Sequence, residues 1–106
     1  GLEVIEKQAF CGCDDLEEII LPHGLKRIGT KAFYSKAPAV KEIYIPETVK
    51  TICKDAFSIS KNKKGINITL PEKFASPYEL DRIGLGNALG NPNVKINIIG
   101  GTINEL

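Results

Sequence analysis

The amino-acid sequence predicts an α/β solenoid of about four coils, with short parallel strands on one face and short helical or 3-10 turns on the other. Three markers recur in step along the chain: an Ala-Phe pair, a proline and an isoleucine. They are Ala9-Phe10, Ala32-Phe33 and Ala56-Phe57; Pro22, Pro46 and Pro71; and Ile5, Ile28 and Ile52. A unit of about two dozen residues cannot bury its own apolar side, so we expect each unit to stack on the next around a shared core.

The markers divide the chain into repeats at residues 2–22, 23–46, 47–71 and a degenerate fourth at 72–106. In the fourth repeat we match Leu80, Ile83, Ala88-Leu89, Ile96 and Ile98 to the repeating positions. Because Ile83 comes late after Pro71, we expect an inserted loop or turn around residues 74–78. All 106 residues form one domain in this interpretation, and the absence of methionine suggests a piece of a longer protein.

The elements within a repeat follow from residue type and alternation. Segments 19–21, 43–45 and 68–70 are rich in β-branched residues and alternate in polarity, which predicts short strands. A proline follows each of them, and proline cannot donate a hydrogen bond to a neighbouring strand. Segment 2–5 and its relatives predict a second, shorter extended stretch. We place each Ala-Phe pair on a helical or 3-10 turn, with the phenylalanine filling the interior.

These repeats resemble the BspA-type leucine-rich repeat. The resemblance rests on residues 5–22, and on residues 28–33 together with 41–46; it covers residues 2–71 well and 72–106 poorly. The family's cysteine between the phenylalanine and the next leucine is matched only by Cys13, with Ala37 and Asn62 in that region of the other copies. The resemblance implies a leucine-rich-repeat right-handed superhelix. It also implies an extracellular or cell-surface location, because such repeats occur in surface and secreted proteins, often as adhesins or host-binding modules.

Composition excludes several classes of function. The near balance of 14 basic and 13 acidic side chains argues against a dedicated nucleic-acid or membrane-surface binder. No stretch approaches the roughly 20 apolar residues of a membrane span. The first repeat is acidic, however, and the next two are basic. This asymmetry favours attraction between neighbouring coils, or else a basic band that meets an anionic partner; the band is Lys36, Lys50, Lys54, Lys61, Lys63 and Lys64.

The sequence offers little catalytic chemistry. His23 is the single histidine and lies between a proline and a glycine, as expected of an exposed turn. Cys11, Cys13, Asp14 and Asp15 form the one metal-like cluster, but zinc sites commonly space two cysteines two to four residues apart. We place Cys13 at a buried repeat position instead. We therefore predict no enzyme activity, no metal and no cofactor.

Strand alternation predicts which side chains face solvent. If Ile19 and Leu21 point into the core, their neighbours point outward, and the stacked repeats arrange the outward residues in two columns. One column is Ile20, Tyr44, Thr69 and Asn97; the other is Glu18, Glu42, Asn67 and Lys95. An exposed isoleucine beside a tyrosine on a sheet can anchor an interface. We predict that these eight residues bind a partner.

We therefore expect a non-catalytic leucine-rich-repeat module that binds a protein or a glycan, possibly from a host, through its strand face. Two alternatives stay open: a structural spacer without a ligand, and the recognition arm of a parent enzyme. Leu2 and the run from Ile96 to Ile99 would leave apolar ends. We accordingly expect flanking repeats or end-to-end self-association.

Overall fold

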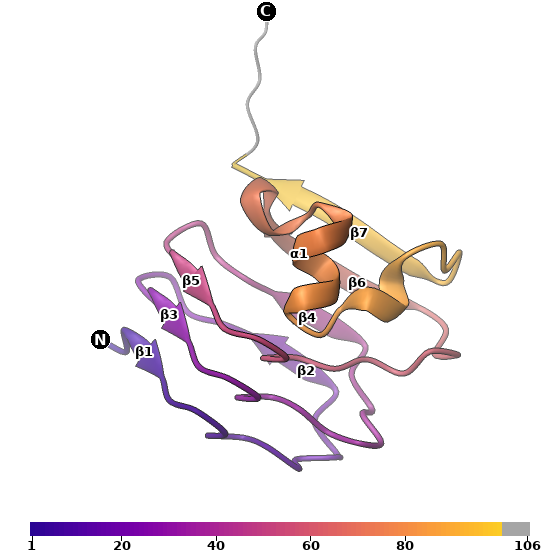
Figure 1. Ribbon diagram of the computed structural model, residues 1–106, viewed down its shortest axis with the longest axis horizontal. Helices are drawn as coiled ribbons and strands as arrows, with labels where there is room; N and C mark the ends of the chain where they lie inside the picture. The colour runs from indigo at the N-terminus through magenta and orange to yellow at the C-terminus, as the bar shows by residue number, and fades with distance from the viewer. Residues whose placement is uncertain (101–106) are drawn as a thin grey trace, which may run out of the picture.

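The chain winds into stacked coils that share two parallel sheets (Figure 1). The computed structural model describes residues 1–100. A three-stranded sheet has the order β1-β3-β5, and a four-stranded sheet has the order β2-β4-β6-β7. The strands are β1 (Val4–Ile5), β2 (Glu18–Ile20), β3 (Arg27–Ile28), β4 (Glu42–Tyr44), β5 (Thr51–Ile52), β6 (Ile66–Pro71) and β7 (Val94–Ile99). The first three repeats each contribute one strand to each sheet.

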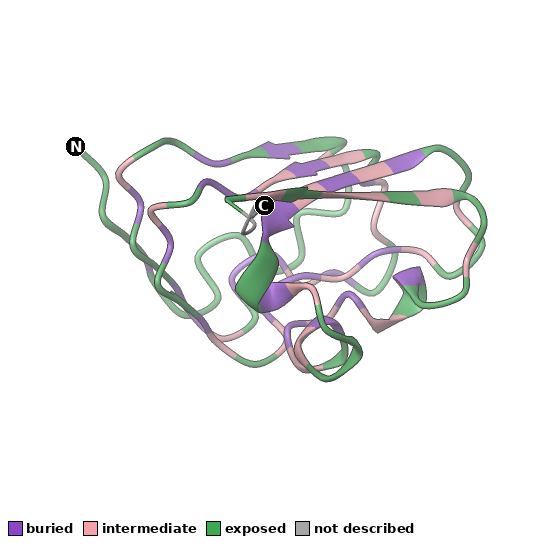
Figure 2. Ribbon diagram, turned by 90° about the horizontal axis from the view of Figure 1, so that it is seen from above, coloured by how far each residue is buried: buried purple, intermediate pink, exposed green. Residues whose placement is uncertain are grey.

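The register of the strands follows the sequence period. Ile5 pairs with Ile28 and Ile28 with Ile52 in the three-stranded sheet. In the other sheet, Ile19, Ile43, Ile68 and Ile96 lie in one row. The first three isoleucines of that row are buried, while Ile96 on the last strand is half-buried. Figure 2 shows the alternation of buried and more exposed residues along the strands. The predicted strands and the second extended stretch are therefore confirmed.

The Ala-Phe turns form a third line of contact between coils. The rings of Phe10 and Phe33 are parallel within 8°, with centroids 5.1 Å apart, and those of Phe33 and Phe57 are parallel within 4° at 5.5 Å. The N–H of Phe10 donates to the carbonyl of Ala32 at 2.7 Å, and the N–H of Phe33 donates to Ala56 at 2.7 Å. The equivalent phenylalanines stack in one column, as the repeat predicts.

The turns themselves differ from the prediction. In the first three coils the Ala-Phe segments contain isolated hydrogen-bonded turns and no helix or 3-10 helix. The residue before each pair has a left-handed backbone: Gln8 at φ 59°, Lys31 at φ 55° and Asp55 at φ 54°. A right-handed helix cannot continue through such a residue. The predicted helical face of these coils is therefore wrong.

The regular helices lie in the fourth segment, where a degenerate repeat and an inserted loop were expected. They are the 3-10 helix η1 (Glu72–Phe74), the helix α1 (Pro77–Arg82) and the 3-10 helix η2 (Gly86–Ala88). Ser76 caps α1 by accepting a hydrogen bond from the N–H of Glu79 at 3.2 Å, and Pro77 begins the helix. Within residues 72–100, only β7 continues a sheet. A fourth coil like the first three is thus not formed; residues 101–106 of that predicted repeat lie outside the described part of the chain.

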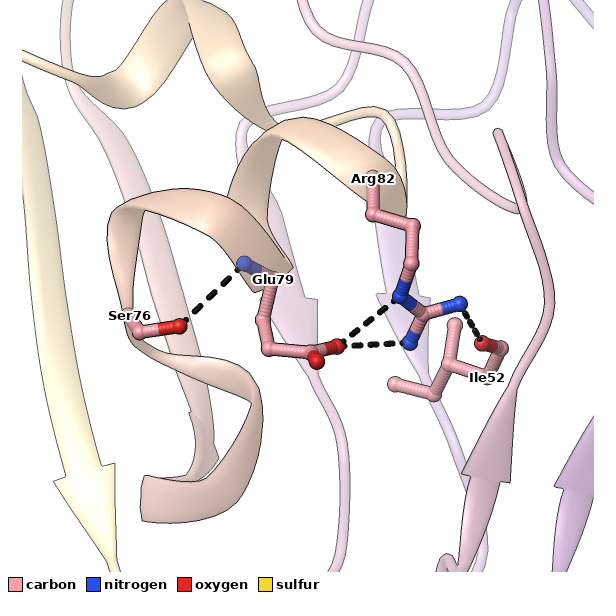
Figure 3. A network of polar contacts seen from close by, with 4 residues as sticks. All are labelled: Ile52, Ser76, Glu79 and Arg82. Atoms are coloured by element: carbon pink, nitrogen blue, oxygen red, sulfur yellow. Dashed lines mark hydrogen bonds and ion pairs between the residues drawn. The ribbon is translucent and has the colours of Figure 1, made fainter.

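Helix α1 closes the edge of the three-stranded sheet. Arg82 donates from Nη1 to the carbonyl of Ile52 on β5 at 2.8 Å (Figure 3). The same guanidinium is held by Glu79 Oε1, at 3.0 Å from Nε and 2.6 Å from Nη2. The side chain of Arg82 therefore donates to a carbonyl that would otherwise accept a hydrogen bond from the N–H of a further strand, and this ends the ladder.

The column of stacked phenylalanine rings also ends where the fourth segment packs on the third coil. The N–H of Phe57 donates to the carbonyl of Ile83 at 3.0 Å. Ile83 and Gly84 therefore occupy the positions that an Ala-Phe pair would have in a fourth coil. The predicted matches of Ala88-Leu89 to the Ala-Phe pairs and of Ile83 to the marker isoleucines Ile5, Ile28 and Ile52 are therefore wrong. Gly84 has φ +94°, and a Cβ there would lie 1.9 Å from the carbonyl oxygen of Phe57. No aromatic side chain can occupy this position.

The core is one cluster of inward side chains from both sheets and the turns. Its ends are less covered: Leu2 and Ile98 are exposed, and Phe10 is 44% exposed. The predicted interior position is therefore wrong for Phe10, because its ring is stacked on one side only, against Phe33. Such ends suit the expected end-to-end association, which stays a prediction. Cys13 is exposed, contrary to its predicted burial, because the turn after Phe10 runs along the outside of the first coil.

Phe33 lies between two stacked rings, so Phe33→Ala removes a large buried side chain and leaves a cavity. We expect a loss of about 3–5 kcal/mol in the free energy of unfolding, measured by chemical denaturation. Phe10→Ala is the matched control and should cost clearly less, because one side of that ring already meets solvent. Equal losses, or a nearly unchanged stability for Phe33→Ala, would contradict the stacked column.

Gly84 and Gly24 both have positive φ, but a Cβ at Gly24 would have no neighbour within 4 Å. Gly24→Ala should cost about 1–2 kcal/mol of backbone strain. Gly84→Ala should cost about 1–3 kcal/mol more, because the new methyl group must also displace the backbone of Phe57. Denaturation of both variants measures the difference, and similar losses would show that the fourth segment does not press on the third coil.

Candidate interaction surface

The outer face of the four-stranded sheet carries the eight residues predicted to bind a partner. Register places Ile20 beside Tyr44, Tyr44 beside Thr69, and Thr69 beside Asn97. The second column pairs in the same way and consists of Glu18, Glu42, Asn67 and Lys95. All eight are exposed or half-exposed. We call this surface the strand face; its arrangement matches the sequence prediction, while its role stays a prediction.

The apolar part of the strand face lies at its N-terminal side. Ile20 is 56% exposed, and the neighbouring ring of Tyr44 is half-buried. Both project from strands whose inward side chains, Ile19 and Ile43, are fixed in the core. The pair is therefore an exposed hydrocarbon and aromatic surface on a rigid support, where contact with a partner would release water at little cost in backbone order.

Two carboxylates lie beside this pair. Glu18 and Glu42 are in register on adjacent parallel strands. Within residues 1–100 neither Glu18 nor Glu42 has an ion pair. Lys41 and Glu17 are both largely exposed at 3.3 Å, which contributes little to stability. Like charges in register repel each other, so this part of the strand face favours a partner that brings a positive charge.

The C-terminal side of the strand face is an ordered amide cluster. Asn97 Nδ2 donates to Asn67 Oδ1 at 3.2 Å and lies 3.4 Å from both the Ile68 carbonyl and Thr69 Oγ1. These contacts tie β7 to β6 from the solvent side. Lys95 is left exposed at the end of its column. The strand face thus changes from apolar and acidic to amide and basic along the stack of coils.

The side chains considered for metal or thiol chemistry are dispersed. Cys11 and Cys13 are exposed free thiols, Cys53 is a half-buried one, and His23 is exposed. Arg27 donates from Nη2 to Cys53 Sγ at 3.6 Å, a contact between coils that the sequence analysis did not anticipate. In the part of the chain that the structure describes, no three His, Cys, Asp or Glu side chains converge as metal ligands would.

Sequence analysis also missed Arg82, the residue that closes the three-stranded sheet. The signal was present in Ser76-Pro77 followed by Glu79, which is typical of a capped helix start.

The helices between residues 1 and 100 are short, and none is long and apolar enough to cross a membrane.

Comparison with known proteins agrees with this architecture. The model of the "BspA type Leucine rich repeat region (6 copies)" matches residues 1–80, about three quarters of the chain. No significant match was found among curated proteins or among solved structures. The matched residues include all of the first three coils and most of α1. The chain therefore belongs to the BspA-type leucine-rich-repeat family.

Proposed function

We propose that this domain is a non-catalytic binding module that holds a protein partner on its strand face, within a larger surface or secreted protein. The observation that carries the proposal is the in-register pair of Ile20 and Tyr44, exposed on a sheet with a fixed inner face. Tyrosine is one of the residues enriched at the few positions that carry most of the binding energy in protein interfaces, and neighbouring contacts contribute by excluding water. The proposed location rests on the family.

The charges beside the pair define the kind of partner. Glu18 and Glu42 lie side by side without a cation, so a lysine or arginine of the partner would replace a repulsion by an attraction. A matching surface would therefore combine an apolar side chain with a basic one a few ångströms away. With a formal net charge of +1 for the whole chain, nothing in the composition favours nucleic acid.

The test uses Ile20→Ala/Tyr44→Ala and the matched control Val4→Ala/Thr51→Ala, which changes outward residues of the three-stranded sheet. A photo-crosslinking residue at position 18 identifies the partner, and binding of that partner is then measured by calorimetry. We expect the strand-face variant to weaken binding at least about tenfold and the control to change it little.

Added salt should weaken the same complex, because part of the attraction is between charges near the surface. Equal effects of the two double variants would contradict the proposal, and so would a crosslinked complex that the strand-face variant leaves unchanged. A domain that yields no specific crosslink from its native source would support the spacer interpretation instead.

A further inference from the structure

A polar groove crosses the turn side of the molecule, away from the strand face. It has a volume of about 750 Å³ and is walled by the second coil, the third coil and the fourth segment. Its side chains include Tyr34, Lys36, Asp55, Lys61, Asp81 and Asn87. A smaller hollow of about 260 Å³ adjoins it toward the first coil and shares Tyr34, Ser35 and Lys36. Together they form one row along the stacking direction, which we call the turn groove.

The walls of the turn groove are fixed to each other by bonds between coils. Ser58 Oγ accepts from the N–H of Ser35 at 2.8 Å and donates to the Ser35 carbonyl at 2.9 Å. The buried Ser35 hydroxyl in turn donates to Asp14 and accepts from the N–H of Ala37. These contacts hold the turns of the first three coils in one arrangement, so a ligand would meet a preformed site.

The fourth segment is attached to the third coil in the same way. Asn87 Nδ2 donates to the carbonyl of Ile59 at 3.0 Å, and Asn91 Nδ2 donates to the carbonyl of Lys61 at 2.9 Å. The Asn87 amide oxygen makes no hydrogen bond within residues 1–100 and is left as an acceptor at the groove. The fourth segment therefore builds the third wall of the groove.

Five other polar side chains that line the turn groove have no hydrogen-bond or ion-pair partner within residues 1–100. In the described residues, the side chains of Lys36, Asp55, Lys61 and Asp81 make no ion pair or hydrogen bond. The Tyr34 hydroxyl makes none either, although Lys31 Nζ lies 5.4 Å from the centre of its ring. Two ammonium groups and two carboxylates give the groove no net charge. Such a site disfavours polyanions and polycations and suits a neutral ligand with many hydroxyl groups.

We propose that the turn groove binds a short neutral saccharide that lies along the stack of coils. Adjacent coils are about 4.8 Å apart, and a pyranose ring advances a glycan by a similar distance. Successive sugars could therefore meet successive coils. Carboxylates accept hydrogen bonds from sugar hydroxyls, and amides and the tyrosine hydroxyl both donate and accept them. The aromatic ring of the tyrosine can contact the C–H face of a sugar.

The test is an NMR titration of the isotope-labelled full chain with cellobiose, lactose and chitobiose. A sulfated heparin disaccharide and a dipeptide serve as charged comparators. We expect at least one neutral sugar to give saturable shifts of amides lining the turn groove, at millimolar concentration. Tyr34→Ala and Asp81→Ala should each raise the dissociation constant about tenfold. Tyr44→Ala, the matched change on the strand face, should leave it unchanged.

The control for folding is Tyr34→Phe, which keeps the ring and removes the hydroxyl; it should weaken binding less than Tyr34→Ala in a protein of equal stability. Three results would overturn the proposal: no saturable shifts with the neutral sugars, tighter binding of the sulfated disaccharide, or shifts confined to the strand face. The first two results leave the protein partner proposed for the strand face untouched, and the third would place the sugar on that face without removing its protein partner, so the two proposals fail independently.

Discussion

The fold depends on contact between successive coils. One coil has too few apolar side chains to enclose a core, and its strands are only two or three residues long in the first two repeats. Each coil is completed by the next, through parallel pairing in two sheets, hydrogen bonds between the Ala-Phe turns, and the stacked rings of Phe10, Phe33 and Phe57. Unfolding of one coil therefore exposes the apolar side of its neighbour to solvent.

The parts of the fold that obey the period could be predicted from sequence. Once Ile19, Ile43 and Ile68 are placed in one row, alternation fixes their outward neighbours, which is why both columns of the strand face were obtained in the correct register. The structure differs from the prediction at positions about which the repeat period gives no information. Non-glycine residues such as Gln8 adopt a left-handed backbone that no motif marks, and the insertion before Ile83 folds as a helix rather than a loop.

The two proposed sites use the same scaffold in different ways. The strand face is supported by the core beneath it, so its side chains are positioned by alternation alone and could be found from sequence. The turn groove is built by side chains that reach from one coil to another, such as Ser58 and Asn87. Its third wall comes from the fourth segment, whose position no repeat specifies. That is the physical reason why Asp81 and Asn87 were not singled out from sequence.

Hydrogen exchange of single amides, followed by NMR, tests the stacked coils most directly. The N–H of Phe33 donates to the third coil, and the N–H of Phe57 donates to the fourth segment that packs on that coil. If the coils form one cooperative stack, these amides should exchange at least about 10³-fold more slowly than an unbonded turn amide such as that of Asp15, and at similar rates to each other. Exchange of the Phe33 amide as fast as that of Asp15 would contradict the stack.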